Sequence, residues 1–182
     1  QEVNQVFYTD VKVPKENLIG ELNKGWDYAK YLLSFERGNA YGPGLKRAIK
    51  KVRKIAHETG ADDASFCARL DDLEIQVSAL EYFELRMFSA MSAGQRPGAE
   101  ASMLKYNGTD LQQAISELSV EALGYYAMPF VRDTWAKTNE PRPGPDFAAP
   151  IAPYYFNLRK ASIYAGSNEI QRNIMAKAVL GL

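Results

Sequence analysis

The chain has very few of the residues from which disulfides and the commonest metal sites are made. Its single cysteine, Cys67, cannot form an internal disulfide, and its single histidine, His57, cannot build a histidine-rich metal site. We therefore expect a reducing, cytoplasmic environment and no metal ligation by these residues.

The sequence also lacks an excess of charge of either sign and a long apolar run. Its 22 Lys and Arg residues balance 22 Asp and Glu residues, so no overall field attracts nucleic acid or an anionic membrane. No apolar run reaches the roughly 18 residues that span a bilayer, and the N-terminus has no targeting pattern. We expect neither a nucleic-acid partner nor a membrane span, and a nucleotide-like ligand would need a local site.

Apolar residues are plentiful, and over most of the chain they recur at spacings of three and four, which is typical of amphipathic helices. A hydrophobic content of 46% among 182 residues is enough for the core of one domain. The pattern predicts an all-α fold, an antiparallel four-helix bundle with short extra helices. The periodic segments are 25–59 with a break at Gly42-Pro43-Gly44, 62–93, 99–136 and 168–180, with a short helix over 153–163.

Two segments depart from the helical pattern. Residues 1–13 contain β-branched and aromatic residues in rough alternation and predict a strand, although a lone strand has no partner with which to form a sheet. Together with a start at Gln1, this suggests a remnant of a missing β domain. Residues 137–153 contain five prolines and predict a long loop, which is typical of functional or crossing segments.

The most informative stretch is Ile163 to Ile174, which reads IYAGSNEIQRNI. A tyrosine, two small residues and a Ser-Asn pair predict a tight turn that leads into a helix, with Ser167 or Asn168 accepting hydrogen bonds from its first backbone N–H groups. The stretch resembles the signature of the acyl-CoA dehydrogenases, Tyr-Glu-Gly-Thr-x-Gln/Glu-Ile-Gln-Arg. One position differs, because Ala165 stands where most members carry their catalytic glutamate.

The same resemblance extends to the beginning of the chain. The sequence from Val6 to Pro14, followed by Asn-Leu-Ile-Gly-Glu and Gly-Trp, is similar to the exit from the middle β domain of this family. The resemblance implies that residues 1–22 are the tail of that domain and that 23–182 form the C-terminal helical domain. A fragment of this extent is expected to be inactive alone, since the flavin ring and much of the substrate pocket need the other domains.

A second motif supplies a carboxylate in place of the missing one. A minority of the family carries its glutamate in a Glu-Arg pair on the first helix of this domain, and the stretch LSFERG contains such a pair, Glu36-Arg37. The resemblance implies that Glu36 is the base that removes the α-proton and that Arg37 orients the site and adds positive charge. From the residues alone, the pattern favours ordinary surface charges for both.

The family resemblance also implies a cofactor, FAD, and an acyl-CoA substrate. By position in the signature, Tyr164 and Gly166 would line the acyl or thioester end of the pocket, while Ser167 and Glu169 would contact the flavin. Gly124 is the one glycine left of the Gly-Gly-x-Gly segment that approaches the pyrophosphate. The alternative for the turn residues is helix capping without any ligand.

A second flavin-binding motif of the family, Arg-x-x-Phe-Gly, is absent at the start of the second long helix, where the chain reads HETGADD. Because the family shares its cofactor between subunits, the loss suggests a tetramer with a homologous, non-identical subunit, although a homotetramer stays open. Electron-transfer flavoprotein is the electron acceptor that the resemblance implies. Two other functions also stay open, a flavin monooxygenase of the same fold and a non-catalytic subunit that completes a partner's site.

Overall fold

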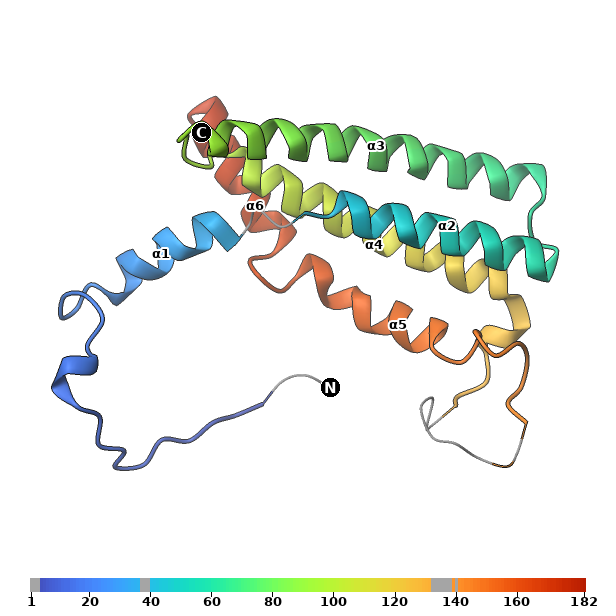
Figure 1. Ribbon diagram of the computed structural model, residues 1–182, viewed down its shortest axis with the longest axis horizontal. Helices are drawn as coiled ribbons and strands as arrows, with labels where there is room; N and C mark the ends of the chain where they lie inside the picture. The colour runs from blue at the N-terminus through green and yellow to red at the C-terminus, as the bar shows by residue number, and fades with distance from the viewer. Residues whose placement is uncertain (1–3, 37–39, 132–138, 140) are drawn as a thin grey trace. The chain divides into compact units, whose positions relative to one another are not determined.

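The computed structural model describes residues 4–36, 40–131, 139 and 141–182, and every structural statement refers to these residues (Figure 1). They contain α-helices and short helical turns and no strand, which confirms the all-α prediction. The helices are α1 (Gly25–Glu36), α2 (Gly42–Thr59), α3 (Ala64–Ser92), α4 (Glu100–Leu123), α5 (Ile151–Leu158) and α6 (Asn168–Met175). The short turns are η1 (Lys15–Asn17), η2 (Gly124–Ala127), η3 (Arg159–Ser162) and η4 (Ala176–Leu180).

The chain divides into two compact units, Gln1–Leu33 and Ser34–Leu182. In the first unit, residues 4–13 form no strand, because a single strand finds no second strand with which to exchange hydrogen bonds. The apolar side chains of this unit, among them Phe7, Ile19 and Trp26, are exposed. The predicted strand is therefore not formed within the described residues.

The second unit is built around α2, α3 and α4, which pack against one another in pairs (Figure 1). Local signals start and end these helices as the sequence predicts. Asp63 caps α3 by accepting a hydrogen bond from the backbone N–H of Phe66 at 2.8 Å, and Gly60 ends α2 in the left-handed conformation. Pro43 lies in the first turn of α2, where its missing N–H costs nothing, so the predicted break separates two helices.

Along these helices the buried side chains form one core. The core residues are Leu45, Ile49, Val52, Ile55, Ala56, Phe66, Leu70, Val77, Leu80, Met87, Ala101, Leu104, Leu111, Ile115, Leu118, Ala122 and Leu123, with Ala148 before α5 and Ile151 at its first position. Along α3 the apolar spacing places Leu70, Val77, Leu80 and Met87 in the core, whereas Leu73, Phe83 and Met91 are only partly buried. The charged residue Glu84 is also buried on this helix.

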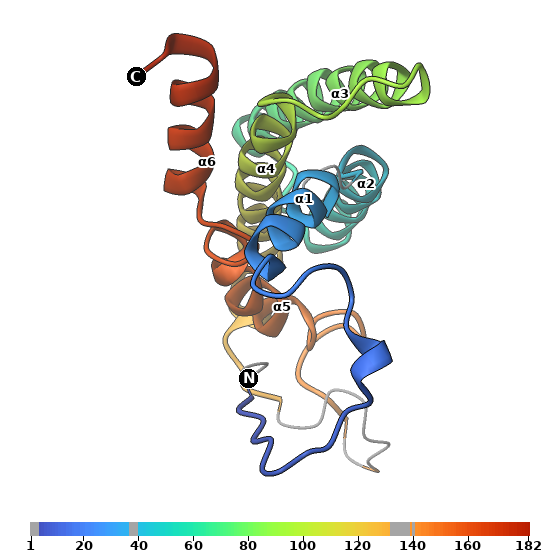
Figure 2. The same ribbon diagram turned by 90° about the vertical axis from the view of Figure 1, so that its left-hand side faces the viewer.

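The remaining helices pack on α4. Both α5 and α6 contact α4, and α6 lies on the side of α4 that faces away from α2 (Figure 2). The helix predicted over 99–136 is interrupted, since α4 ends at Leu123 and the described residues from there to Val131 form only the η2 turn; residues 132–136 lie outside the described part of the chain. Gly124 adopts φ 58° and ψ −131°, a conformation that is open to glycine and incompatible with continuing a helix.

No helix within the described residues is long and apolar enough to cross a membrane.

Candidate functional site

The predicted turn is present between η3 and α6. The backbone N–H of Tyr164 donates to the Lys160 carbonyl at 3.0 Å, and the chain then reverses through Ala165 at φ 56° and Gly166 at φ 86°. Ser167 is extended and its hydroxyl accepts from the N–H of Ile170 at 3.5 Å. The predicted N-cap is confirmed as Ser167, and two successive residues in the left-handed region shape the turn.

Asn168 does not cap the helix and instead points into the protein, where it joins α6 to α4. Its Oδ1 accepts from Lys105 Nζ at 2.8 Å and from Thr109 Oγ1 at 3.2 Å. Its Nδ2 donates to Asp110 Oδ1 at 2.9 Å. Lys105 is only 3% exposed, and burial lowers the pKa of its ammonium, an effect that Asp110 and Glu169 partly oppose.

Gln171 supports the turn from beneath. Its side chain is 0% exposed, and its Nε2 donates to the Gly166 carbonyl at 3.2 Å. A Cβ at Gly166 would lie 2.6 Å from Nε2, so a side chain at this position would displace the amide. The Oε1 atom of Gln171 has no hydrogen-bond partner within the described part of the chain.

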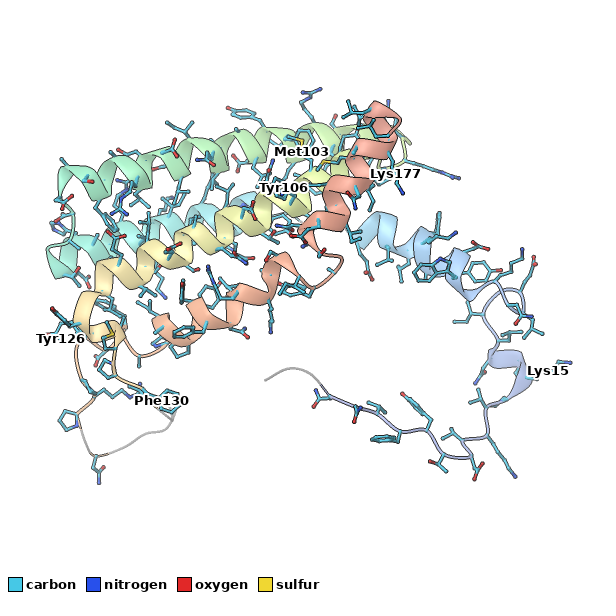
Figure 3. All side chains as sticks on the ribbon, turned by 180° about the vertical axis from the view of Figure 1, so that it is seen from behind. Lys15, Met103, Tyr106, Tyr126, Phe130 and Lys177 are labelled. Atoms are coloured by element: carbon cyan, nitrogen blue, oxygen red, sulfur yellow. The ribbon has the colours of Figure 1, made fainter. Side chains whose placement is uncertain are left out.

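Glu169 is exposed at the start of α6 and is held in its charged form. Its own backbone N–H lowers the pKa of its carboxyl the most, followed by the Ser167 hydroxyl and by the charges of Arg172 and Lys105. Arg172 donates to the Tyr106 hydroxyl and lies over its ring, with the guanidinium carbon 4.4 Å from the ring centroid. Figure 3 shows Tyr106 on α4 beside α6.

The predicted site residues do not all belong to one local group. Tyr164, Gly166, Ser167 and Glu169 share the turn. Gly124 directly follows α4, whereas Lys105 and Thr109, which anchor α6, lie in the first half of α4. At a rise of about 1.5 Å per residue, these two residues lie roughly 20 Å from Gly124 along the helix. Within one copy of the chain, Gly124 therefore lies far from the turn.

The predicted acid–base pair lies at the end of α1. Glu36 is the last residue of that helix and its side chain is exposed. Arg37 lies outside the described residues. The catalytic roles predicted for this pair therefore stay predictions.

Several residues at the turn escaped sequence interpretation. Lys105 and Glu84 are charged residues on long helices, and such residues are usually solvated. One signal of burial was available in the sequence, because each residue lies next to the regularly spaced apolar residues of its helix. Lys105 directly follows Leu104, and Glu84 lies between Leu80 and Met87.

Comparison with known proteins identifies the fold. Residues 23–180 match the family model described as "Acyl-CoA dehydrogenase, C-terminal domain". The chain belongs to the acyl-CoA dehydrogenase family. This confirms the resemblance, since the match covers all six α-helices.

Similar members of the acyl-CoA dehydrogenase family include proteins named as parts of complexes. The chain is 29% identical over its whole length to acyl-CoA dehydrogenase IpdE1 of Mycobacterium tuberculosis and covers 44% of that protein. It superposes on the ChsE4–ChsE5 complex of the same organism with a TM-score of 0.75 at 26% identity, covering 97% of this chain and 45% of the other. A structure named Tcur3481-Tcur3483 steroid ACAD has the same fold, with a TM-score of 0.78 at 22% identity, over 97% and 44% of the two chains.

The chain spans less than half the length of these acyl-CoA dehydrogenases. Its turn residues fit one edge of a flavin, because Gly166 and Glu169 are exposed and a polar hydroxyl and a carboxylate are presented at the start of α6. Gly124 also leaves its surroundings open, since a Cβ there would meet no atom within 4 Å. The two groups of residues are too far apart to hold one end of a cofactor together.

Proposed function

We propose that this chain is the C-terminal helical part of an FAD-dependent acyl-CoA dehydrogenase that uses Glu36 as its base. The observation that carries the proposal is Ala165. It occupies the catalytic position of the signature, in a turn whose geometry is otherwise that of a ligand-facing loop, and it has no titratable group. A carboxylate must therefore come from another element, and the Glu36-Arg37 pair at the end of α1 supplies one.

The chemistry divides between two carbon atoms of the acyl group. Glu36 takes a proton from the α-carbon. The electron pair of the broken α-C–H bond forms the new α,β double bond as the β-carbon loses a hydride. When bound, FAD supplies the acceptor for that hydride at its N5 atom. Tyr164 and Gly166 border the space left by Ala165, and Arg37 would orient the thioester beside Glu36.

Ser167 and Glu169 would hold one edge of the flavin in this proposal. The Ser167 hydroxyl donates to Glu169 and accepts the capping bond, so its remaining lone pair can accept a hydrogen bond from the cofactor. The carboxylate of Glu169 is kept charged by its surroundings. It can accept hydrogen bonds from the hydroxyl groups of the ribityl chain or from an N–H group of the flavin ring. Gly124 would approach a phosphate of a different cofactor molecule, because it lies far from the turn of its own chain.

The parent enzyme is proposed to be a tetramer that contains a second, related subunit, with electron-transfer flavoprotein as its electron acceptor. Two observations support the mixed assembly. The chain lacks the Arg-x-x-Phe-Gly motif and keeps one glycine of the Gly-Gly-x-Gly segment, and two of the similar solved structures carry paired chain names. Measurement of one FAD per identical subunit would contradict this assembly.

The decisive experiment is Glu36→Gln in the intact protein, with Glu16→Gln as the control, since Glu16 is another exposed glutamate. Flavin bleaching is followed in anaerobic single-turnover experiments with a panel of acyl-CoA thioesters. We expect the rate to fall by at least about a hundredfold in Glu36→Gln, the usual loss for removal of a general base, and to be unchanged in Glu16→Gln. Equal rates for Glu36→Gln and wild type would rule out Glu36.

Two other functions are distinguished by the same experiment. The absence of a carboxylate at Ala165 also suits a monooxygenase of the same fold, for which flavin reduction would depend on a nicotinamide cofactor and not on a thioester. A non-catalytic subunit would show no thioester-dependent reduction until its partner is added, and Glu36→Gln would then have no effect in the assembled complex.

A further inference from the structure

Tyr41 lies where the start of α2 meets the turn. It directly precedes α2 and its backbone is fixed by Glu84 of α3, whose carboxylate accepts from the N–H groups of Tyr41 and Gly42. Glu84 is only 2% exposed. A Cβ on Gly42 would lie 2.9 Å from Glu84 Oε2, so the glycine is needed for this close approach. A buried carboxylate thus holds the peptide that carries the Tyr41 side chain.

The ring of Tyr41 is held by α4. A Cβ on Gly108 would lie 2.5 to 2.7 Å from three carbons of this ring, which shows that the ring packs directly on the bare backbone of Gly108. Gly108 lies within the same turn of α4 as Lys105 and Thr109, the two residues that bind Asn168. One turn of α4 therefore carries the Tyr41 ring and the first residue of α6 side by side.

The surroundings of the Tyr41 hydroxyl agree with this placement. The side chain is half-buried, and burial raises the pKa of Tyr41, with further contributions from Tyr164 and from Glu84. The ring of Tyr41 is thus a neighbour of Tyr164, the residue that precedes Ala165. It is also five positions after Glu36 in the sequence.

We propose that Tyr41 is a specificity-determining residue, a fixed aromatic wall that limits the size of the acyl group accepted beside Ala165. Glu84 of α3 fixes the backbone of Tyr41, and the ring packs on Gly108 of α4, so the ring cannot move aside without losing close-packed contacts. Bulky acyl groups would meet this wall, whereas slender ones would pass it. The inference rests on the proposed function and adds a determinant of substrate shape.

The test uses the intact, FAD-loaded protein and two thioesters, butyryl-CoA as the slender probe and 3-cyclohexylpropanoyl-CoA as the bulky one. The quantity measured is the ratio of kcat/KM for flavin reduction, bulky over slender. We expect Tyr41→Ala to raise this ratio by at least about tenfold, the effect of a volume change of a few methylene groups in an apolar pocket. Tyr41→Phe keeps the ring and should leave the ratio at the wild-type value.

Circular dichroism and flavin content establish that each variant is folded and loaded, and Tyr41→Leu replaces Tyr41→Ala if the latter does not fold. An unchanged ratio in a folded alanine or leucine variant would overturn the inference, as would a tenfold change in Tyr41→Phe. Failure of the wild-type protein to reduce flavin with any thioester would overturn the proposed function itself, which separates the two conclusions.

Discussion

Asn168 is the residue through which the turn is tied to the core. Its amide makes three hydrogen bonds, two accepted from Lys105 and Thr109 and one donated to Asp110. Lys105 has no carboxylate among its hydrogen-bond partners at this junction, so its buried ammonium depends on the amide oxygen. A buried charged donor without an acceptor is costly, and the junction is therefore sensitive to loss of Asn168.

We expect Asn168→Ala to reduce the free energy of unfolding by roughly 2–3 kcal/mol, because it removes the amide oxygen that accepts from the buried ammonium of Lys105. Asn173→Ala is the matched control, since Asn173 lies on the same helix and is exposed, and its effect should stay within about 0.5 kcal/mol. Urea unfolding of the intact protein, followed by circular dichroism, measures both. Equal effects of the two substitutions would show that the junction contributes nothing particular.

For single residues, the sequence predicts hydrogen-bond partners well when they are close along the chain and poorly when they are distant. Ser167 was expected as a cap because its partner, the N–H of Ile170, is three residues away. Lys105 and Glu84 bind groups that lie 63 and about 43 positions away along the chain, and no local pattern records such a pairing. Their burial follows from the packing of α6 and α2 against other helices, which the sequence alone does not define.

At the scale of elements, glycine and proline determine where the helices begin and end. Pro43 starts α2, and Gly60 and Gly124 lie directly after α2 and α4. The segment 99–136 was predicted as one helix because its apolar spacing continues past Gly124, and a single glycine is often tolerated inside a helix. The positive φ of Gly124, which ends the helix, is a property of the folded chain.

Gly166 gives an element-scale prediction, since both its backbone and its surroundings exclude a side chain. At φ 86°, with a hypothetical Cβ 2.6 Å from Gln171 Nε2, Gly166→Ala should reduce the free energy of unfolding by roughly 1–3 kcal/mol. Gly44→Ala is the opposite case, because Gly44 lies within α2 and a Cβ there meets no atom within 4 Å. It should leave stability unchanged or raise it by up to about 1 kcal/mol.

Thermal unfolding of the two variants beside wild type checks this pair of expectations. A lower melting temperature for Gly166→Ala, with an equal or higher one for Gly44→Ala, agrees with a turn that requires glycine. A Gly166→Ala variant as stable as wild type would mean that the turn relaxes to accept a side chain, and that Gln171 does not define it.

At the scale of the whole chain, the all-α class and the helical spacing followed from composition and periodicity, because three long amphipathic helices can bury their apolar faces only against one another. The arrangement of α5 and α6 on α4 did not follow, since both are short and their contacts depend on buried polar groups. The buried Lys105, where α6 contacts α4, makes the free energy of unfolding depend on pH. The direction of that dependence follows from the shift in its pKa.

The pKa of Lys105 is lowered in the folded chain from the ordinary value of 10.5. Between the lowered pKa and 10.5, the unfolded chain binds more protons than the folded one, so the contribution of Lys105 to the free energy of unfolding rises with pH. The pKa of Tyr41 is raised from 10.0, and its contribution falls with pH above that value. The two effects oppose each other near pH 10 and must be separated by substitution.

We therefore expect the difference in free energy of unfolding, wild type minus Lys105→Met, to increase with pH as the ordinary pKa of lysine is approached. Methionine keeps the length of the side chain and removes the buried charge, and the groups that do not interact with Lys105 cancel in the difference. Urea unfolding at a series of pH values from 7 to about 10 measures it, and repeating the pair in a Tyr41→Phe background removes the opposing contribution. A difference that falls with pH would mean that folding favours the charged form of Lys105, and that the Asn168 junction is an ion-pair network with Asp110 and Glu169 in place of a desolvated amine.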